Sequence, residues 1–166
     1  MLYTIFQAVI ILAIICVIAL VINKVEDRRR SYMSFRESLD LTGLPIITFK
    51  WRDKRLHFLL DTGANFSVIN EKVAAKIAEN TQINMRGSSK LVGLGGEVKE
   101  CPHLPIELSY KDKLYQEKFQ VTDMSKPFKE IKNMHGVTLH GILGNSFLER
   151  YKYVLDFKEM IAYSKK

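Results

Sequence analysis

The feature that most restricts the fold of this chain is an apolar segment near its N-terminal end. Leu2 to Ile22 reads LYTIFQAVIILAIICVIALVI, in which only Thr4 and Gln7 are clearly polar and no side chain is charged. Its 21 residues are long enough to span the hydrocarbon core of a bilayer as a helix. Fourteen of them are Leu, Ile, Phe or Val, and together these favour insertion by roughly 4 to 8 kcal/mol. We therefore predict a transmembrane helix over residues 1–23.

A cleaved secretory signal is the alternative for this segment. Such signals begin with basic residues and have apolar cores of about 7 to 15 residues. This segment has no basic start and a longer apolar run, so the sequence favours a retained anchor.

Positive charges follow the apolar segment at once, at Lys24, Arg28, Arg29 and Arg30. Because positive residues concentrate on the cytoplasmic side of a membrane, this arrangement predicts a short outer N-terminus and a cytoplasmic body. We interpret residues 24–43 as a basic juxtamembrane tether whose arginines either contact anionic lipid head groups or form a solvated flank of the anchor. The expected localisation is the membrane, as a single-pass protein with the lipid bilayer as one partner.

The charges, cysteines and histidines argue against several other classes of protein. The chain has 25 Lys and Arg against 18 Asp and Glu, but outside residues 24–30 these charges are dispersed, so nucleic acid is not an expected partner. Cys16 lies in the apolar segment and Cys101 far from it, so we expect no disulfide within the chain. We expect no metal site and no cofactor, because the scattered histidines match no zinc-ligand spacing. These histidines are His57, His103, His135 and His140.

From Leu44 onward, short apolar runs alternate with turn residues, a pattern typical of a mainly β domain, which we place at residues 44–166. Asn70 is a predicted N-cap for a helix that ends at Asn80. Residues 125–138 show no clear period and are expected to form a surface excursion. The expected strands are 44–51, 55–60, 103–110, 114–124, 153–157 and 160–163, with a short helical stretch at 146–150.

A glycine-rich segment, Gly93-Leu94-Gly95-Gly96, lies between two apolar stretches. Glycine adopts positive φ angles without penalty, so this composition suits the tip of a hairpin. A phosphate-binding loop is excluded, since a dinucleotide fingerprint needs a helix after the glycines, and here Pro102 and a further strand follow. The core candidates on the next hairpin are Ile106, Leu108, Phe119 and Val121.

The segment with the clearest chemical use is Asp61-Thr62-Gly63, which follows the apolar pair Leu59-Leu60. The Asp61 carboxylate is therefore expected at the end of a buried strand, at the edge of an apolar core. Gly63 lets the chain turn sharply and lets another backbone or a substrate approach, and the Thr62 hydroxyl can lock the loop by a hydrogen bond. Alone, the tripeptide is also compatible with an ordinary turn that Asp61 caps.

In its context, this segment resembles the active-site motif of the retroviral-type aspartic proteases, the single-lobe relatives of pepsin. The motif extends from Leu59 to Ala64, and the glycines at 93–96 stand where the family has its flap. Gly141-Ile142-Leu143-Gly144-Asn145 precedes a short helix, as does the C-terminal element of the family. The resemblance covers residues 44–163 and implies a mainly β, retropepsin-like acid protease fold. That fold is a closed, barrel-like half-lobe with a short helix, here preceded by one transmembrane helix.

The resemblance also implies which residues form the site. Asp61, Thr62 and Gly63 are the expected catalytic residues. Asn65 stands where such proteins often have Ser, Thr or Asp, a departure that concerns local hydrogen bonds. The chain has only one Asp-Thr-Gly, whereas the mechanism needs two carboxylates, so we expect a homodimer in which two Asp61 side chains face each other. The expected substrate contacts are Ala64, Asn65, Gly93, Leu94, Gly95 and Gly96.

The function that follows from the resemblance is that of a membrane-anchored aspartic endopeptidase. It hydrolyses peptide or protein substrates in extended conformation with a water held between two Asp61 carboxylates. A catalytically inactive, membrane-anchored dimerisation or peptide-binding module of the same fold is the alternative, and it would bind an extended peptide by strand addition without cutting it. The intact Asp61, Thr62 and Gly63 favour the enzyme.

Overall fold

The computed structural model describes residues 7, 10–20, 33–81, 83, 85, 87–92 and 97–165. The chain divides into two compact units, Met1–Tyr32 and Met33–Lys166. In the first unit, Gln7 and residues 10–20 are helical. No helix within the described ranges combines the length and the apolar character that a membrane crossing requires. The other residues of the predicted transmembrane helix, and residues 24–32 of the predicted tether, lie outside the described residues.

The second unit includes residues that the sequence analysis assigned to the tether. Met33 and Phe35 are 2% and 3% exposed, and Phe35 packs in the main apolar core. Helix α2 (Phe35–Thr42) starts with a capping box, in which Ser34 and Glu37 each bond the other's backbone N–H through the side chain. Because burial and capping both fix this segment, the folded unit begins at Met33, ahead of the predicted domain start.

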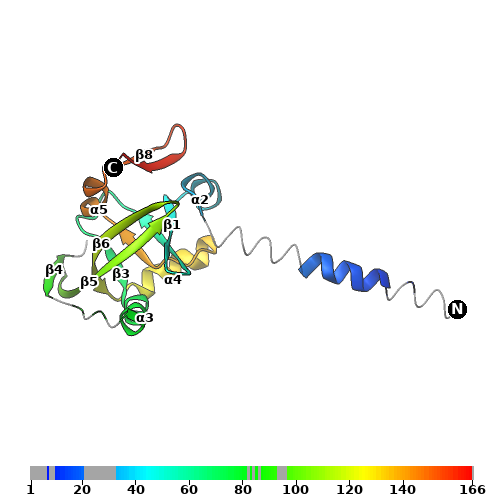
Figure 1. The fold of residues 1–166 in the computed structure, drawn as a ribbon, viewed down its shortest axis with the longest axis horizontal. Coiled ribbons are helices and arrows are strands. Elements are labelled where there is room, and N and C mark those ends of the chain that lie inside the picture. Colours follow the sequence, from blue (N-terminus) through cyan, green and yellow to red (C-terminus); the bar gives the residue numbers. More distant parts are fainter. Residues whose placement is uncertain are drawn as a thin grey trace. The chain divides into compact units, whose positions relative to one another are not determined.

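Six strands form a closed barrel (Figure 1). They are β1 (Ile46–Trp51), β2 (Lys54–Leu60), β3 (Val68–Asn70), β5 (Val98–Tyr110), β6 (Lys113–Thr122) and β7 (Gly141–Leu143). Around the barrel the order is β1-β2-β7-β3-β6-β5, and a pairing of Lys50 with Ser109 closes β5 onto β1. β4 (Ser88–Val92) pairs with β5 outside this ring. The predicted mainly β, closed barrel is therefore confirmed.

Side chains that alternate along the long strands fill the barrel. The four predicted core residues of the β5–β6 hairpin, Ile106, Leu108, Phe119 and Val121, are all buried. Phe58 of β2 stacks on Phe119 with 5.4 Å between the ring centroids. Burial of such side chains is the main source of stability for a barrel of this size.

Three further helices and a hairpin surround the barrel: α3 (Glu71–Thr81), α4 (Ser125–His135), α5 (Asn145–Arg150), and β8 (Tyr153–Asp156) with β9 (Ile161–Ser164). Figure 1 shows α3 and the hairpin of β8 at opposite ends of the barrel. The predicted N-cap of α3 is confirmed, because Asn70 Oδ1 accepts a hydrogen bond from the Lys72 N–H at 3.0 Å.

One prediction of local structure is wrong, because α4 occupies most of the segment from 125 to 138 that was expected to be irregular. The helix ends at Gly136, whose φ of 71° is typical of a C-cap. Phe128 is its buried residue, and it packs with Ile46 and Leu139 in a separate small core cluster. Phe128 and Ile131 are spaced as on one helix face and both pack in this cluster, an apolar pair that the sequence analysis overlooked.

Two histidines join the neighbouring strands near the start of this unit. The His57 N–H donates to His140 Nδ1 at 3.0 Å, and the His140 N–H donates to the His57 carbonyl oxygen at 2.9 Å. The Thr48 hydroxyl oxygen accepts from the Met33 N–H at 2.7 Å, so its own hydrogen is available to His57 Nδ1, 2.8 Å away. His140 Nδ1 accepts a main-chain N–H and therefore carries no proton, which makes His140 neutral, and His57 accepts from Thr48 in its neutral tautomer with a bare Nδ1.

This arrangement predicts a loss of stability in acid. Burial, then the charges of His140 and Arg55, lower the pKa of His57 from 6.5 to about 4. The unfolded chain binds this proton below about pH 6.5, whereas the folded chain binds it only near pH 4. The free energy of unfolding therefore has its highest value above about pH 6.5. It should fall between about pH 6.5 and 4 by up to about 3 kcal/mol. Urea unfolding of the full-length chain at a series of pH values measures the fall.

The variant His57→Gln serves as the control for this measurement. It lacks the titrating group, so its free energy of unfolding should depend less steeply on pH between about 6.5 and 4. Parallel pH dependences in the two proteins would show that His57 is not the group responsible.

Candidate active site

The predicted catalytic residues lie in the loop between β2 and β3. Asp61 directly follows β2 and is half-buried, whereas Thr62 and Gly63 are exposed. The Asp61 N–H donates to the Leu143 carbonyl oxygen of β7 at 3.0 Å, so the main chain is held at the residue itself. Asp61 Oδ1 accepts from the Gly63 N–H at 2.8 Å. A Cβ at Gly63 would lie 3.2 Å from the same oxygen, so glycine leaves room for the carboxylate.

The first turn of α5 holds this loop from the other side. The Asn145 N–H donates to the Ala64 carbonyl oxygen at 2.7 Å, and the Ser146 N–H donates to the Asn65 carbonyl oxygen at 3.0 Å. The side-chain amide of Asn145 donates to the Thr62 carbonyl oxygen at 2.9 Å. The loop is thus fixed through its main chain, which sets the position of Asp61 without engaging its carboxylate.

Gly144 makes this close approach possible. A Cβ at this position would lie 2.6 Å from the carbonyl oxygens of both Ala64 and Phe66, closer than packed atoms approach. The Gly144 N–H donates to the hydroxyl of Ser67, which is fully buried, at 3.3 Å. The apolar run into Gly144 therefore packs directly against the Asp61 loop, as two crossed turns.

A buried carboxylate on β6, which the sequence analysis missed, anchors α5. Glu117 is 3% exposed, and its Oε1 accepts from the Ser146 hydroxyl at 2.9 Å. Its Oε2 lies 3.3 Å from Nη1 of Arg150. Because a buried charge costs several kcal/mol unless it is paired, these contacts hold α5 against the strand. The available sequence signal was the alternation along β6, which puts Glu117 on the same buried face as Phe119.

The structure places only part of the predicted substrate contacts. Ala64 is half-buried and Asn65 exposed, and both lie in the Asp61 loop. Residues 93–96, the predicted flap glycines with Leu94, lie outside the described residues. Their hairpin is described up to its last pair, Val92 with Val98.

The chemistry available at the loop is that of a single carboxylate that accepts a main-chain N–H from Gly63. Such a carboxylate can accept a proton from a bound water, but peptide hydrolysis of this kind also needs a proton donor. No group of three or more His, Cys, Asp and Glu side chains among the described residues could hold a metal ion. His57 and His140 serve the strand junction described above.

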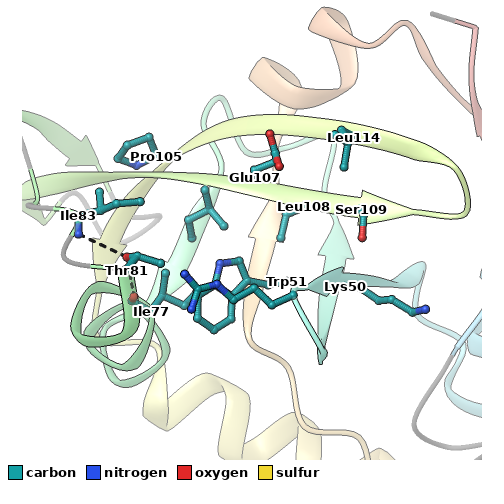
Figure 2. Close-up of a pocket in the computed structure, with 12 residues that line it drawn as sticks. Lys50, Trp51, Ile77, Thr81, Ile83, Pro105, Glu107, Leu108, Ser109 and Leu114 are labelled. Atoms are coloured by element: carbon teal, nitrogen blue, oxygen red, sulfur yellow. Dashed lines mark hydrogen bonds between the residues drawn. The ribbon is translucent and has the colours of Figure 1, made fainter.

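A cavity of about 380 Å³ lies away from this loop (Figure 2). Trp51 of β1, Ile77 of α3 and Leu108 of β5 are among its lining residues, and none of residues 61–65 contributes to it. Trp51 and Asp61 adjoin opposite ends of β2, whose seven residues span roughly 20 Å. The cavity is therefore separate from the candidate active site.

Comparison with known proteins agrees with this geometry. Residues 47–147 match the aspartyl protease family. Among solved structures, the retroviral protease-like domain of Ddi1 from Leishmania major is similar with a TM-score of 0.54 and 14% identity, over 74% of this chain and 89% of that one. The EIAV protease complexed with the inhibitor HBY-793 has a TM-score of 0.46 and 21% identity, over 64% and 86% of the two chains. No curated protein matches the chain.

The closed barrel and the crossed turns of Asp61 and Gly144 define a single-lobe, retropepsin-like fold, to which the Ddi1 domain is similar over most of its length. The family match extends over more than half of the chain. The chain belongs to the aspartyl protease family.

The anchor of α5 gives a prediction for stability. Arg150→Ala leaves the Glu117 carboxylate buried without its cation, so we expect a loss of about 1 to 3 kcal/mol in the free energy of unfolding. Adding Glu117→Leu to Arg150→Ala should recover part of that loss, because no buried charge then remains. Urea unfolding of each variant provides the measurement.

The control is Glu97→Ala, which breaks the exposed ion pair with Lys99, whose atoms are 3.8 Å apart. Exposed pairs contribute little, so this change should cost less than about 0.5 kcal/mol. A loss at Arg150 no larger than the loss at Glu97 would contradict an anchoring role for the buried pair.

Proposed function

We propose that this chain is an aspartic endopeptidase that works as a homodimer and is anchored in the membrane by its N-terminal segment. Its substrates are peptides or proteins in extended conformation. The observation that carries the proposal is the Asp61 loop, in which α5 fixes the main chain while the catalytic carboxylate follows a buried strand. Membership of the aspartyl protease family supports the same chemistry.

The reaction needs two carboxylates in one site. When two such groups lie about 3 Å apart they cannot both ionise, so the pair holds one proton and titrates as a unit. The ionised carboxylate takes a proton from a water that attacks the amide carbon. The protonated carboxylate polarises the amide oxygen and then supplies a proton to the leaving nitrogen.

The second carboxylate comes from a second copy of the chain. Asp-Thr-Gly occurs once in the sequence, and the turn that packs against the Asp61 loop carries Gly144 and Asn145, so one chain holds one such carboxylate. A two-fold axis beside the loop sets the two Asp61 side chains face to face. Phe66, 52% exposed next to the loop, adds an apolar side chain to the face that such an axis would cover.

The membrane part of the proposal rests on the sequence of residues 1–30. The apolar run from Leu2 to Ile22 has the length and composition of a transmembrane helix. The four cations at positions 24–30 would keep the protease unit on the cytoplasmic side and contact lipid head groups. Two copies held in one bilayer have a raised effective concentration, which favours the dimer.

Substitution of Asp61 tests the enzymatic proposal directly. We expect the full-length protein to cleave members of a peptide library and Asp61→Asn to lose at least about a thousandfold in turnover, because the amide cannot act as the general base. Asp53→Asn is the matched control, since Asp53 is exposed in the turn at the other end of β2. Equal turnover by the wild type and Asp61→Asn would remove Asp61 as the catalyst, and no turnover by a well-folded wild-type dimer would favour the peptide-binding module.

The shared site predicts how mixed dimers behave. When wild-type chains are co-expressed with an equal amount of Asp61→Asn, random pairing leaves roughly a quarter of the dimers with two intact carboxylates. Turnover per wild-type chain should therefore fall to about half of its value in the absence of the variant. A protein that is strictly monomeric by size measurement and still active would contradict the one-carboxylate argument.

The membrane orientation has a test of its own. A reporter that is active only in the cytoplasm, fused after Lys166, should be active, because the cations that follow the apolar run stay on that side. A matched fusion to a variant with residues 24, 28, 29 and 30 changed to Gln should lose this preference. Activity of an export-dependent reporter in the unchanged protein would reverse the proposed localisation.

A further inference from the structure

The strand β5 changes partner at His103, and there the β4–β5 hairpin leaves the barrel. On the hairpin side, the pairing of β4 with β5 runs from Val92 and Val98 to Ser88 and Pro102. On the barrel side, the pairing of β5 with β6 begins at His103 with Gln120 and continues to the far turn. Side chains at this junction are therefore placed to fix the angle between the β4–β5 hairpin and the barrel.

A hydrogen-bonded chain of three side chains occupies this junction. The Gln120 side-chain amide donates to the Ser89 hydroxyl oxygen, which leaves the Ser89 hydrogen for His103 Nε2, 2.7 Å away. In one tautomer His103 Nε2 accepts from Ser89, and in the other it donates to the same oxygen, so the contact is kept in both. The three residues come from β6, β4 and β5, so the chain joins the outer strand of the hairpin to the barrel.

The main chain of Gln120 connects the same junction to the catalytic loop. Its N–H donates at 2.9 Å to the carbonyl oxygen of Ser67, the residue before β3. The Ser67 hydroxyl in turn accepts from the Gly144 N–H, at the turn that packs against the Asp61 loop. One residue of β6 therefore touches the hairpin through its side chain and the end of the catalytic loop through its backbone.

The burial of Gln120 indicates that this position is not an ordinary surface site. Gln120 is 2% exposed, and neither its Oε1 nor His103 Nδ1 has a hydrogen-bond partner among the described residues. A buried polar atom without a partner costs roughly 1 to 3 kcal/mol, whereas an apolar side chain of similar size would avoid that cost. The geometric observation that bears on its role is the hydrogen bond from its side-chain amide to Ser89 across the junction.

A serine nucleophile activated by histidine is the other chemistry that Ser89 and His103 suggest. The geometry does not support it, because the Ser89 oxygen already accepts from Gln120 and the second ring nitrogen of His103 has no carboxylate to orient it among the described residues. The Ser89 hydroxyl therefore acts as a bridge between two side chains.

We propose that Gln120 is a positioning residue that sets the β4–β5 hairpin relative to the Asp61 loop through Ser89 and Ser67. The inference rests on the proposed function, together with the expectation from the sequence that both the Asp61 loop and the glycine-rich segment between β4 and β5 contact the substrate. A peptide that bonds both elements is bound more weakly when their relative position is lost, while the carboxylate chemistry is untouched. The effect should therefore appear in KM rather than in kcat.

The test compares Gln120→Leu and Ser89→Ala with Gln116→Leu in the full-length protein. Gln116 is an exposed glutamine on the same strand, so its replacement is the matched control. With a peptide selected from the library, we expect KM to rise about tenfold in the first two variants, with kcat within about twofold of the wild type. A merely structural role would reduce the fraction of folded enzyme and so lower kcat with KM unchanged, which would overturn the proposal.

Hydrogen exchange gives a readout that does not require activity. The amides of residues 88–92 should exchange at least about fivefold faster in Gln120→Leu and Ser89→Ala than in Gln116→Leu, because the outer strand has lost its tie to the barrel. Unchanged exchange there overturns the proposal. If the wild-type protein cleaves no peptide, the proposed function fails while the exchange result still decides the positioning role. If Gln120→Leu does not fold, the same measurements are made on Ser89→Ala, whose substitution lies at a half-buried position.

Discussion

The parallel pairing of β2 with β7 is the interaction on which the rest of this structure depends. It aligns Leu60 with Leu143, so that the chain leaves both strands at the same place and the Asp61 loop meets the Gly144 turn. Parallel neighbours cannot be joined by a tight turn, so the intervening chain has to form the other half of the barrel. Gly141 permits the close approach of β7 to β3, because a Cβ at this position would lie 2.5 Å from the Val68 carbonyl oxygen.

Local patterns predicted most of the barrel, and they failed where burial depends on distant residues. β1, β2, β6, the barrel part of β5 and the N-cap at Asn70 could be inferred because alternation and capping are properties of neighbouring residues. β3 and β7 have three residues each, too few to show alternation, and were not predicted as strands. The burial of α4 could not be inferred, since Phe128 and Ile131 pack against Ile46 of a strand that is distant in the sequence. Met33 could not either, because it is fixed by Thr48 through bonds across 15 positions. These long-range contacts form only when the chain folds into the barrel.

The same division applies to the candidate active site. Asp61 could be singled out because the residues of its motif are contiguous, and the resemblance identified Gly144 as part of the C-terminal element of the family. Glu117 and Gln120 are polar residues whose partners lie 29 and 31 positions away, and no short motif marks such a pair. Alternation along β6 could have marked Glu117 as a charge on a buried face, but it could not name Ser146 as the partner.

The two buried polar residues of β6 hold the Asp61 loop through two separate sets of contacts. Glu117 and Gln120 are three positions apart, so they point to opposite faces of the strand. Glu117 fixes α5, which bonds the carbonyl oxygens of the Asp61 loop, whereas Gln120 bonds Ser67 at the end of that loop. Both routes end on the main chain. The described contacts of α5 and Gln120 therefore position Asp61 through the backbone, and the hydrogen bond given for its carboxylate comes from the Gly63 N–H.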